Sequence, residues 1–246
     1  MRTLIVLPTY NEAENISEVV TRIRGALPDA GILVVDDSSP DGTADIVEGL
    51  AVDIEGLSVL RRPEKSGLGP AYRAGFAEGR RQGFEVLVEM DSDLSHNPDD
   101  LPRLLDAVTD GADLALGSRY IPGGSIPDWP WYRRALSIGG NRFAAIVLGI
   151  AVSDATSGFR AYRASALDLL EVEKVTADGY GFQIEMTYRL VQAGGQITEV
   201  PISFTDRVRG ESKMSWRIIG EAASLVLRWG FSDRVLRRVW PRQRSH

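Results

Sequence analysis

The sequence contains no cysteine, which excludes a disulfide framework and any metal site built from thiolates. Histidine is also scarce: His96 and His246 are the only two, so a site built from several imidazoles is not supported. The longest apolar stretch, residues 143–152, has about half of the roughly 20 residues that cross a bilayer. We therefore expect a protein that does not cross a membrane, and the lack of cysteine agrees with a reducing compartment.

Two nucleotide-binding motifs are missing as well. No G-x-G-x-x-G follows the first apolar run, and no G-x-x-x-x-G-K-[ST] occurs anywhere in the chain. Their absence weakens a dinucleotide-dependent oxidoreductase and a P-loop enzyme as interpretations. The start, MRTLIVLPTYNE, lacks the longer apolar stretch and the small-residue cleavage site of a signal peptide, so we interpret it as a first strand.

What the chain does contain is enough hydrophobic residues, 43% of 246, to bury the core of one large domain, or of one domain with an extension. Its net charge of −6 is unevenly distributed. Residues 206–246 contain ten basic and four acidic residues, a charge of +6, which leaves 18 basic and 30 acidic residues, or −12, in the rest. A basic segment on an acidic body indicates that the segment meets an anionic partner.

Short apolar runs alternate with helical patterns through the first 120 residues. Runs without polar alternation are typical of strands that helices cover on both faces. We therefore expect an α/β fold with a doubly wound, mostly parallel sheet, which binds ligands beyond the carboxyl ends of its strands. The expected strands cover residues 3–8, 31–37, 57–62, 84–91 and 112–118, and the expected helices lie at about 14–27, from 43, over 69–83 and after 98.

Beyond residue 120 the alternation is looser, and a loop rich in glycine, proline and aromatic residues comes first. Pro201 favours an edge position for the last strand, because proline donates no hydrogen bond to a neighbouring strand. The elements expected here are a helix at about 134–150, a short strand at 157–163, a helix over 181–195, a strand over 196–207 and a helix from 214 to about 239.

Two acids directly follow one of the buried strands. Asp91 and Asp93, with only Ser92 between them, end the apolar run, and Asn97 with Pro98 predicts the start of a helix. Alone, such a pair is more often a solvated turn. At the ligand-binding edge of this sheet we interpret it as a site for Mg²⁺ or Mn²⁺, whose remaining ligands come from a bound phosphate.

Other polar groups are expected at the same edge of the sheet. In VVDDSSPDG, residues 34–42, either Asp36 or Asp37 is a candidate to accept hydrogen bonds from a ribose or a base, and ordinary turn chemistry is the alternative. Several basic residues in glycine-rich loops are candidates to clamp phosphates together, although each alone is more often a surface charge. These are Arg119, Arg133, Arg134, Arg207 and Lys213.

The motifs PTYNE, VVDDSSPDGT, GLGPAYRAGF, MDSDLSHNP, GSRY, SGFRAY, GYGFQIEM and GESKM occur in this order between Leu4 and about Lys213. In this combination the chain resembles the family 2 glycosyltransferases of the GT-A fold, and within them the polyprenol- or dolichol-phosphate mannose synthases. The resemblance implies an inverting transfer of mannose from GDP-mannose to a polyprenyl monophosphate, with Mg²⁺ or Mn²⁺ as cofactor. We expect a GT-A catalytic domain at 1–213 and a basic amphipathic helical extension at 214–246.

The same resemblance implies roles for individual residues. The expected catalytic residues are Asp93, Arg119 and Arg133, and the expected acceptor-phosphate site consists of Arg119, Arg133 and Ser137. The metal is expected at Asp91, Asp93 and Ser95, the last at a position where some relatives carry a metal-binding glutamine. The donor is expected to contact Pro8, Tyr10, Glu12, Asp37, Asp91, Ser92, Asp93, Lys174, Arg207, Ser212 and Lys213.

An ionised acceptor simplifies the chemistry that this resemblance implies. A phosphate monoester has a second pKa near 6, so it attacks near neutral pH without a general base. We therefore expect no dedicated proton acceptor and assign Asp93 to the metal. Departure of a nucleoside diphosphate builds negative charge, which a metal and basic side chains neutralise.

Two other functions stay open at this point. The same fold could transfer glucose or an N-acetylhexosamine from a UDP-sugar to a lipid phosphate, or it could bind a nucleotide without catalysis. A nucleic-acid partner is not expected, because the body of the chain is acidic and carries no motif of that class.

A polyprenyl acceptor stays in the bilayer, so such an enzyme must reach the membrane surface. We expect peripheral association with the cytoplasmic face through residues 231–246, or a membrane-protein partner bound through the same face. For residues 214–230, packing on the catalytic body is an equal alternative. The apolar stripe that carries this expectation consists of Trp216, Ile219, Ala223, Val226, Leu227, Phe231, Val235, Leu236, Val239 and Trp240, with arginines beside it.

Overall fold

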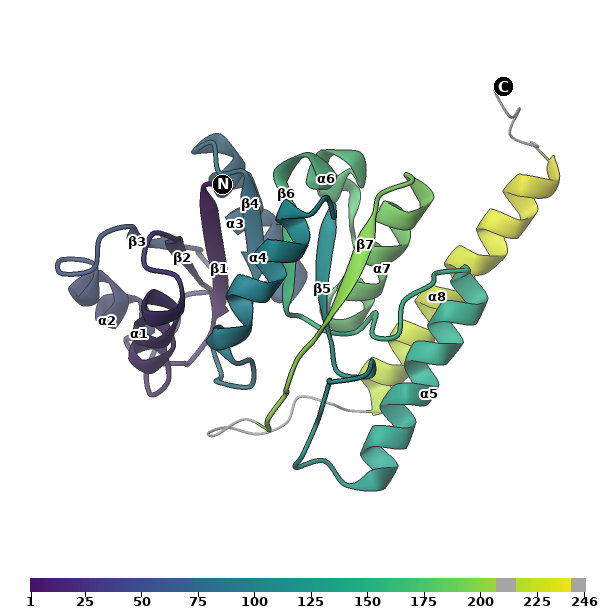
Figure 1. Cartoon of the computed structure of the whole chain (residues 1–246), viewed down its shortest axis with the longest axis horizontal. Helices are drawn as coiled ribbons and strands as arrows, with labels where there is room; N and C mark the ends of the chain where they lie inside the picture. The colour runs from purple at the N-terminus through teal and green to yellow at the C-terminus, as the bar shows by residue number, and fades with distance from the viewer. Residues whose placement is uncertain (207–215, 240–246) are drawn as a thin grey trace.

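The computed structural model of the chain describes residues 1–206 and 216–239, with side chains in the second range described for 220–231. Arg207, Ser212 and Lys213, which were expected to contact the donor, lie outside the described residues, as does the start of the extension at 214. The described part is a layered α/β structure in which helices cover both faces of a sheet (Figure 1). Within it, no helix is both long and apolar enough to cross a bilayer.

The described residues form seven strands, which lie in the order β3-β2-β1-β4-β6-β5-β7. The strands are β1 (Thr3–Thr9), β2 (Gly31–Asp36), β3 (Leu57–Arg61), β4 (Val86–Glu89), β5 (Leu114–Ser118), β6 (Arg160–Arg163) and β7 (Ile197–Pro201). The α-helices are α1 (Ile16–Ala26), α2 (Thr43–Leu50), α3 (Leu68–Arg81), α4 (Leu101–Thr109), α5 (Trp131–Leu148), α6 (Ala164–Leu169), α7 (Gly179–Gln192) and α8 (Trp216–Val239). Two short 3₁₀ helices are η1 (Pro98–Asp100) and η2 (Val172–Lys174).

One strand of the sheet runs against its neighbours. β6 is antiparallel to both β4 and β5, whereas the other neighbouring strands pair in parallel. The prediction of a doubly wound, mostly parallel sheet is therefore confirmed, although the place of β6 between β4 and β5 was not foreseen. β7 lies at the edge of the sheet, as Pro201 predicted.

The apolar strands are buried because each face of the sheet carries its own layer of helices. Ile5 and Leu7 of β1 pack in one cluster with residues of α1, α2 and α4. Leu4 and Val6 point the other way and pack with residues of α3, α6 and α7. Successive side chains of a strand point to opposite faces, so a strand buried on both must be apolar throughout. The continuous runs seen in the sequence have this cause.

α5 and α8 pack against each other at one end of the sheet (Figure 1). Val226 of α8 is buried in a cluster with Ala144 of α5 and Ile184 of α7. At Gly230, an added Cβ would lie 2.6 Å from Val147 Cγ1, so this glycine permits the close approach of the two helices. The part of α8 described up to Gly230 therefore supports packing on the body of the protein, one of the two interpretations left open for 214–230.

Candidate active site

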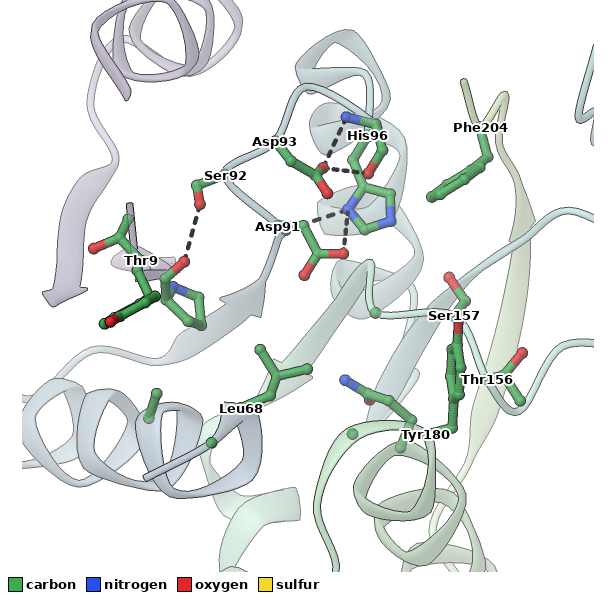
Figure 2. Close-up of a pocket in the computed structure, with 18 of the residues that line it drawn as sticks. Thr9, Leu68, Asp91, Ser92, Asp93, His96, Thr156, Ser157, Tyr180 and Phe204 are labelled. Atoms are coloured by element: carbon green, nitrogen blue, oxygen red, sulfur yellow. Dashed lines mark hydrogen bonds and ion pairs between the residues drawn. The ribbon is translucent and has the colours of Figure 1, made fainter. Parts of the chain in front are cut away.

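A cleft of about 540 Å³ opens at the carboxyl ends of β1, β2 and β4, which is where a doubly wound sheet binds ligands. Ser92 Oγ donates a hydrogen bond to the Pro8 carbonyl oxygen (3.0 Å), which ties the end of β4 to β1 (Figure 2). The predicted site residues that line the cleft are Pro8, Tyr10, Glu12, Asp37, Asp91, Ser92, Asp93, Ser95, Arg119 and Arg133.

The two acids after β4 are held by a tight turn. Ser95 donates two hydrogen bonds to Asp93 Oδ1, from its backbone nitrogen (3.1 Å) and from its hydroxyl (2.5 Å). The backbone nitrogen of Asp91 donates to His96 Nδ1 (3.3 Å), and Leu94 adopts a positive φ of 64° between them. Asp93 is buried, whereas the Asp91 side chain is 30% exposed toward the cleft (Figure 2). The turn thus holds the Asp93 carboxylate and the Asp91 backbone in place.

His96 is part of this turn and stays uncharged. Burial lowers its pKa to about 4, although the nearby Asp93 carboxylate opposes the shift. Its ring stacks on Phe159 with the centroids 5.0 Å apart. A neutral imidazole accepts the hydrogen bond from the Asp91 backbone, so His96 stabilises the turn.

The structure separates the two adjacent acids after β2. Asp36 is buried and accepts hydrogen bonds from the hydroxyls of Thr9 (2.9 Å) and Ser39 (2.6 Å), so it holds the loop. Asp37 lines the cleft, where Arg62 Nη1 donates to its Oδ1 over 2.8 Å. Of the two residues left open from the sequence, Asp37 is the one that lines the cleft.

Lys65 is a cleft residue that the sequence reasoning missed. Its Nζ lies 3.8 Å from the centroid of the Tyr10 ring, and both residues line the cleft. Its place after β3 could have predicted this, because the loops that follow the parallel strands β1 to β4 all begin at the same edge of the sheet. Several other cleft residues were also missed, namely Trp129, Thr156, Ser157, Gly158, Asp178, Tyr180, Gln183, Phe204 and Asp206.

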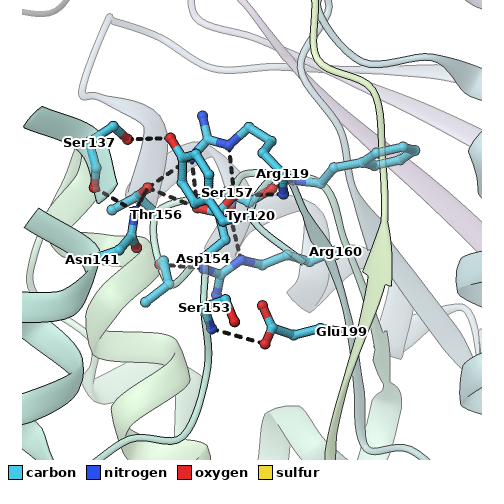
Figure 3. A network of polar contacts seen from close by, with 12 residues as sticks. Arg119, Tyr120, Ser137, Asn141, Ser153, Asp154, Thr156, Ser157, Arg160 and Glu199 are labelled. Atoms are coloured by element: carbon cyan, nitrogen blue, oxygen red, sulfur yellow. Dashed lines mark hydrogen bonds and ion pairs between the residues drawn. The ribbon is translucent and has the colours of Figure 1, made fainter. Parts of the chain in front are cut away.

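Arg119 follows β5 and is held in a buried ion pair (Figure 3). Its Nε and Nη2 donate to the two oxygens of Asp154 over 2.6 and 2.7 Å, and Nη2 also reaches the hydroxyl of Thr156 (2.9 Å). Asp154 is fully buried; burial alone would raise its pKa, but the Arg119 guanidinium holds that pKa below its ordinary value. The guanidinium is therefore fixed in place, and most of its charge is balanced by the protein.

Arg133 lies at the start of α5 and is held more loosely. Its Nη1 donates to both oxygens of Asp206 (3.0 and 3.1 Å), and its guanidinium carbon lies 3.9 Å from the Trp129 ring centroid. The Arg133 side chain is 19% exposed and that of Asp206 is 44% exposed, in contrast to the buried Arg119 pair. Arg133 is therefore more accessible to solvent than Arg119.

A second, apolar groove of about 110 Å³ adjoins the cleft. Arg119 and Trp129 line both cavities, so the two lie next to each other at these residues. Ser137, expected at the acceptor phosphate, lines this groove and accepts a hydrogen bond from the hydroxyl of Tyr120 (2.7 Å). The apolar lining comes from α5, α7 and α8 and includes Leu136, Phe143, Ala144, Ile184 and Val226.

Comparison with known proteins identifies the family. Residues 4–170 match the family described as Glycosyl transferase family 2. A polyprenol monophosphomannose synthase of Mycolicibacterium smegmatis is 49% identical over 235 residues, which cover 95% of this chain and 89% of that protein. An undecaprenyl-phosphate mannosyltransferase of Micrococcus luteus is 48% identical over 234 residues, or 95% of this chain and 96% of that protein. The chain is a family 2 glycosyltransferase.

The glycosyltransferase also shares its fold with solved structures. A mannosyltransferase of Pyrobaculum calidifontis, solved with GDP-mannose and Mn²⁺, has a TM-score of 0.63 at 20% identity over 95% of this chain and 64% of that chain. Glucosyl-3-phosphoglycerate synthase of Mycobacterium tuberculosis, solved with Mn²⁺ and UDP-glucose, has a TM-score of 0.62 at 22% identity over 94% of this chain and 78% of that chain. These similarities confirm the fold predicted from the motifs.

The residues of the glycosyltransferase fit a divalent cation that is shared with a ligand. Among the residues that the structure describes, no group of three or more histidine and acidic side chains could hold a metal by itself. Asp91 and Asp93 provide two carboxylates on one wall of the cleft. Mg²⁺ is commonly held by one or two carboxylates together with substrate phosphates, so this pair suits a cation that binds with a diphosphate.

Lys174 of the glycosyltransferase does not reach the cleft. It lies in η2 with its side chain 66% exposed, and its Nζ pairs with Glu171 Oε1 over 2.7 Å. Lys174 does not line the cleft, so this geometry does not support the predicted contact with the donor. Ser95 lines the cleft, but its hydroxyl donates to Asp93, and this geometry favours a role in positioning Asp93.

Proposed function

We propose that this glycosyltransferase transfers mannose from GDP-mannose to a polyprenyl monophosphate, giving polyprenyl-phosphate-mannose and GDP. The observation that carries the proposal is that a cleft with two carboxylates suited to a metal lies next to an apolar groove, with Arg119 lining both. A nucleotide sugar suits the cleft. A lipid phosphate suits both cavities, with its phosphate in the cleft and its apolar chain in the groove. The names of the two relatives at 48–49% identity support the same donor sugar and acceptor class.

On the donor side, we assign the nucleoside to the wall formed by Tyr10, Glu12 and Asp37. The Asp37 carboxylate accepts hydrogen bonds only, which suits ribose hydroxyls. Asp91 and Asp93 would hold Mg²⁺ or Mn²⁺ against the diphosphate. When bound, the cation would neutralise the charge that develops on the departing diphosphate. Lys65, beside Tyr10, is a further positive group on this wall.

On the acceptor side, we assign Arg133, Arg119 and Ser137 to the lipid phosphate. A phosphate oxygen attacks C1 of the sugar while the bond from C1 to the diphosphate oxygen breaks, and the configuration at C1 inverts. Because the second pKa of a phosphate monoester is near 6, the attacking oxygen is already ionised and no residue has to remove a proton. The arginines position the phosphate and screen its charge.

The membrane contact belongs to the same proposal. Large apolar side chains are exposed on α5 and α8, among them Trp131 (81%), Ile146 (77%) and Phe231 (72%). Such side chains on helices that border the apolar groove suit insertion at the lipid interface, which would bring the polyprenyl chain to the groove. Flotation with anionic liposomes tests this contact: binding should weaken in an Ile146→Ser variant and stay unchanged in a Leu169→Ser variant, because Leu169 is exposed on α6. The cytoplasmic location stays a prediction.

The deciding experiment measures transfer of labelled sugar into an organic extract. The full chain is incubated with a polyprenyl phosphate, Mg²⁺ and labelled GDP-mannose, UDP-glucose or UDP-GlcNAc. Transfer from GDP-mannose alone, lost with EDTA or when the acceptor is the unphosphorylated polyprenol, is the expected result. Preferred transfer from a UDP-sugar would replace mannose with that sugar, and binding without transfer in every arm would favour a nucleotide-binding module.

A further inference from the structure

One buried polar side chain of the cleft lacks hydrogen-bond partners among the described residues. Gln183 of α7 lines the cleft and is 2% exposed. Its amide lies close enough to Glu89 to lower the pKa of that carboxyl, yet among the described residues neither the amide nitrogen nor the amide oxygen has a partner in hydrogen-bond geometry. A buried amide without such partners costs free energy, so an amide on a cleft wall points to a ligand that supplies them.

The position of Gln183 relative to the metal-suited acids narrows down the ligand. A Cβ added to Gly158 would lie 3.7 Å from Gln183 Nε2 and 3.7 Å from Asp91 Oδ2. Gly158 therefore faces the gap between the amide and the carboxylate, and all three residues line the cleft. In a nucleotide sugar, the sugar is bonded to the phosphate that the cation holds. A group bound beside Asp91 and Gln183 is then a candidate for the sugar.

We infer that Gln183 and Gly158 form the subsite of the transferred hexose. In this subsite the Gln183 amide forms hydrogen bonds with the sugar hydroxyls, and Gly158 leaves room for the ring. The inference rests on the proposed function, because it takes the donor to be a nucleotide sugar. An amide both donates and accepts hydrogen bonds, and so does each sugar hydroxyl. The two groups can therefore pair in either direction. The nearby Asp178 carboxylate is already committed, since it accepts from the backbone nitrogen of Gly69 (2.7 Å).

Gly158 offers a substitution that the protein itself tolerates. Its φ is not positive, and the nearest atoms to an added Cβ lie at 3.7–3.8 Å, which is ordinary contact. In Gly158→Ala the chain should fold unchanged while the methyl group enters the space assigned to the sugar. Gly139→Ala is the matched control, because no atom lies within 4 Å of a Cβ added there and the residue does not line either cavity.

The test compares a ligand without the sugar to one with it. Binding of GDP and of GDP-mannose is measured by calorimetry with Mg²⁺, and transfer by kcat/KM. Gly158→Ala should leave the Kd of GDP within about twofold and lower kcat/KM for GDP-mannose by about 10-fold to 100-fold, the range of one or two lost polar contacts. If binding of GDP weakened as much as binding of GDP-mannose, the assignment to the sugar would be overturned. Unchanged binding of both ligands would overturn it as well.

Gln183→Leu keeps the approximate volume of the side chain and removes its polar atoms. We expect the variant to lose most of its preference for GDP-mannose over GDP-glucose with only a small change in stability to urea, because among the described residues neither amide atom has a partner in hydrogen-bond geometry. A destabilised variant with unchanged sugar preference would show a purely structural role. If the wild type uses a UDP-sugar, the proposed function fails, and the same comparison with UDP and that UDP-sugar still decides the subsite.

Discussion

Two acids and two arginines line different parts of the cleft, which we call its acidic and its basic wall, and the two walls are built in different ways. On the sheet side, Asp91 and Asp93 follow a buried strand directly and are fixed by hydrogen bonds within one short turn. On the other side, Arg119 and Arg133 come from the segment after β5 and from α5, and each is paired with an acid more than 30 residues away in the chain. An acidic wall can hold an anionic diphosphate only through a cation, whereas a basic wall receives a phosphate directly. The contrast teaches that two anionic substrates can share one cleft when only one of them brings a metal.

Removing an acid should have the largest effect on activity. Asp93→Ala takes away a ligand of the proposed cation, and the loss of several kcal/mol of leaving-group stabilisation corresponds to about a thousandfold in turnover. Single-turnover transfer with saturating Mg²⁺ measures this loss. Asp99→Ala is the control, because Asp99 is exposed in η1 and does not line the cleft. Transfer that persists in EDTA at a near-wild-type rate would contradict the metal on this wall.

Within the basic wall, the two arginines should differ in their effect on stability. Arg119→Ala leaves the carboxylate of Asp154 buried without its partner, which costs about 3–5 kcal/mol of unfolding free energy. Arg133→Ala should cost less than about 1 kcal/mol, because Asp206 stays in contact with water. Urea unfolding monitored by tryptophan fluorescence measures both values. Equal losses in the two variants would show that the burial of the Arg119 pair carries no energetic weight.

The same arginines should also differ in how they act on catalysis. Arg133→Ala should raise the KM for polyprenyl phosphate by about tenfold, the worth of one charge-assisted hydrogen bond, and leave the KM for GDP-mannose unchanged. Arg134→Ala removes the same charge from the next, exposed position and serves as the control. A raised KM for GDP-mannose with an unchanged KM for polyprenyl phosphate would instead assign Arg133 to the site of the sugar donor.

The smallest effect concerns two buried groups beside the acidic wall with opposite pH dependence. Burial raises the pKa of Glu89 from 4.5 to about 7, against the influence of Arg160, so its contribution to stability is complete below pH 4.5 and lost as the pH rises through 7. Burial lowers the pKa of His96 from 6.5 to about 4, so its contribution is present above pH 6.5 and lost as the pH falls through 4.

Between pH 4.5 and 6.5 the two contributions change in opposite directions and largely cancel. Glu89→Gln removes one of them. Over this range, its unfolding free energy in EDTA should therefore rise with pH more steeply than that of the wild type, by on the order of 1 kcal/mol per pH unit. Parallel curves for the two proteins would show that Glu89 is ionised in the folded state.

The acidic wall could be predicted from the sequence and the basic wall only in part. Each acid follows an apolar run directly, and the strand that precedes it sets its place at the edge of the sheet. The place of Lys65 follows from the same rule, although it was overlooked. Arg119 and Arg133 were named from motifs, but their partners Asp154 and Asp206 have no local signal, because an ion pair between distant segments depends on how the chain folds back.

The fold shows the same division. The strands of the parallel part were predicted nearly in full, since burial on both faces leaves a continuous apolar run. β6 was expected only as a short strand, and nothing local could place it between β4 and β5 with reversed direction. Gln183 was expected only as part of a helix, because an amide within a helical pattern gives no local sign that it faces a cleft.

The central place of β6 also sets when the site can form during synthesis. β4 is complete at Glu89, but the strand that pairs with it on the far side from β1 is made only at Arg160–Arg163. At about 5–20 residues per second, the ribosome exposes β4 with one unpaired edge for several seconds, and an unpaired edge is a template for pairing with other chains. The speed of translation through the α5 segment therefore bears on how much nascent protein escapes aggregation, independently of any effect on the reaction.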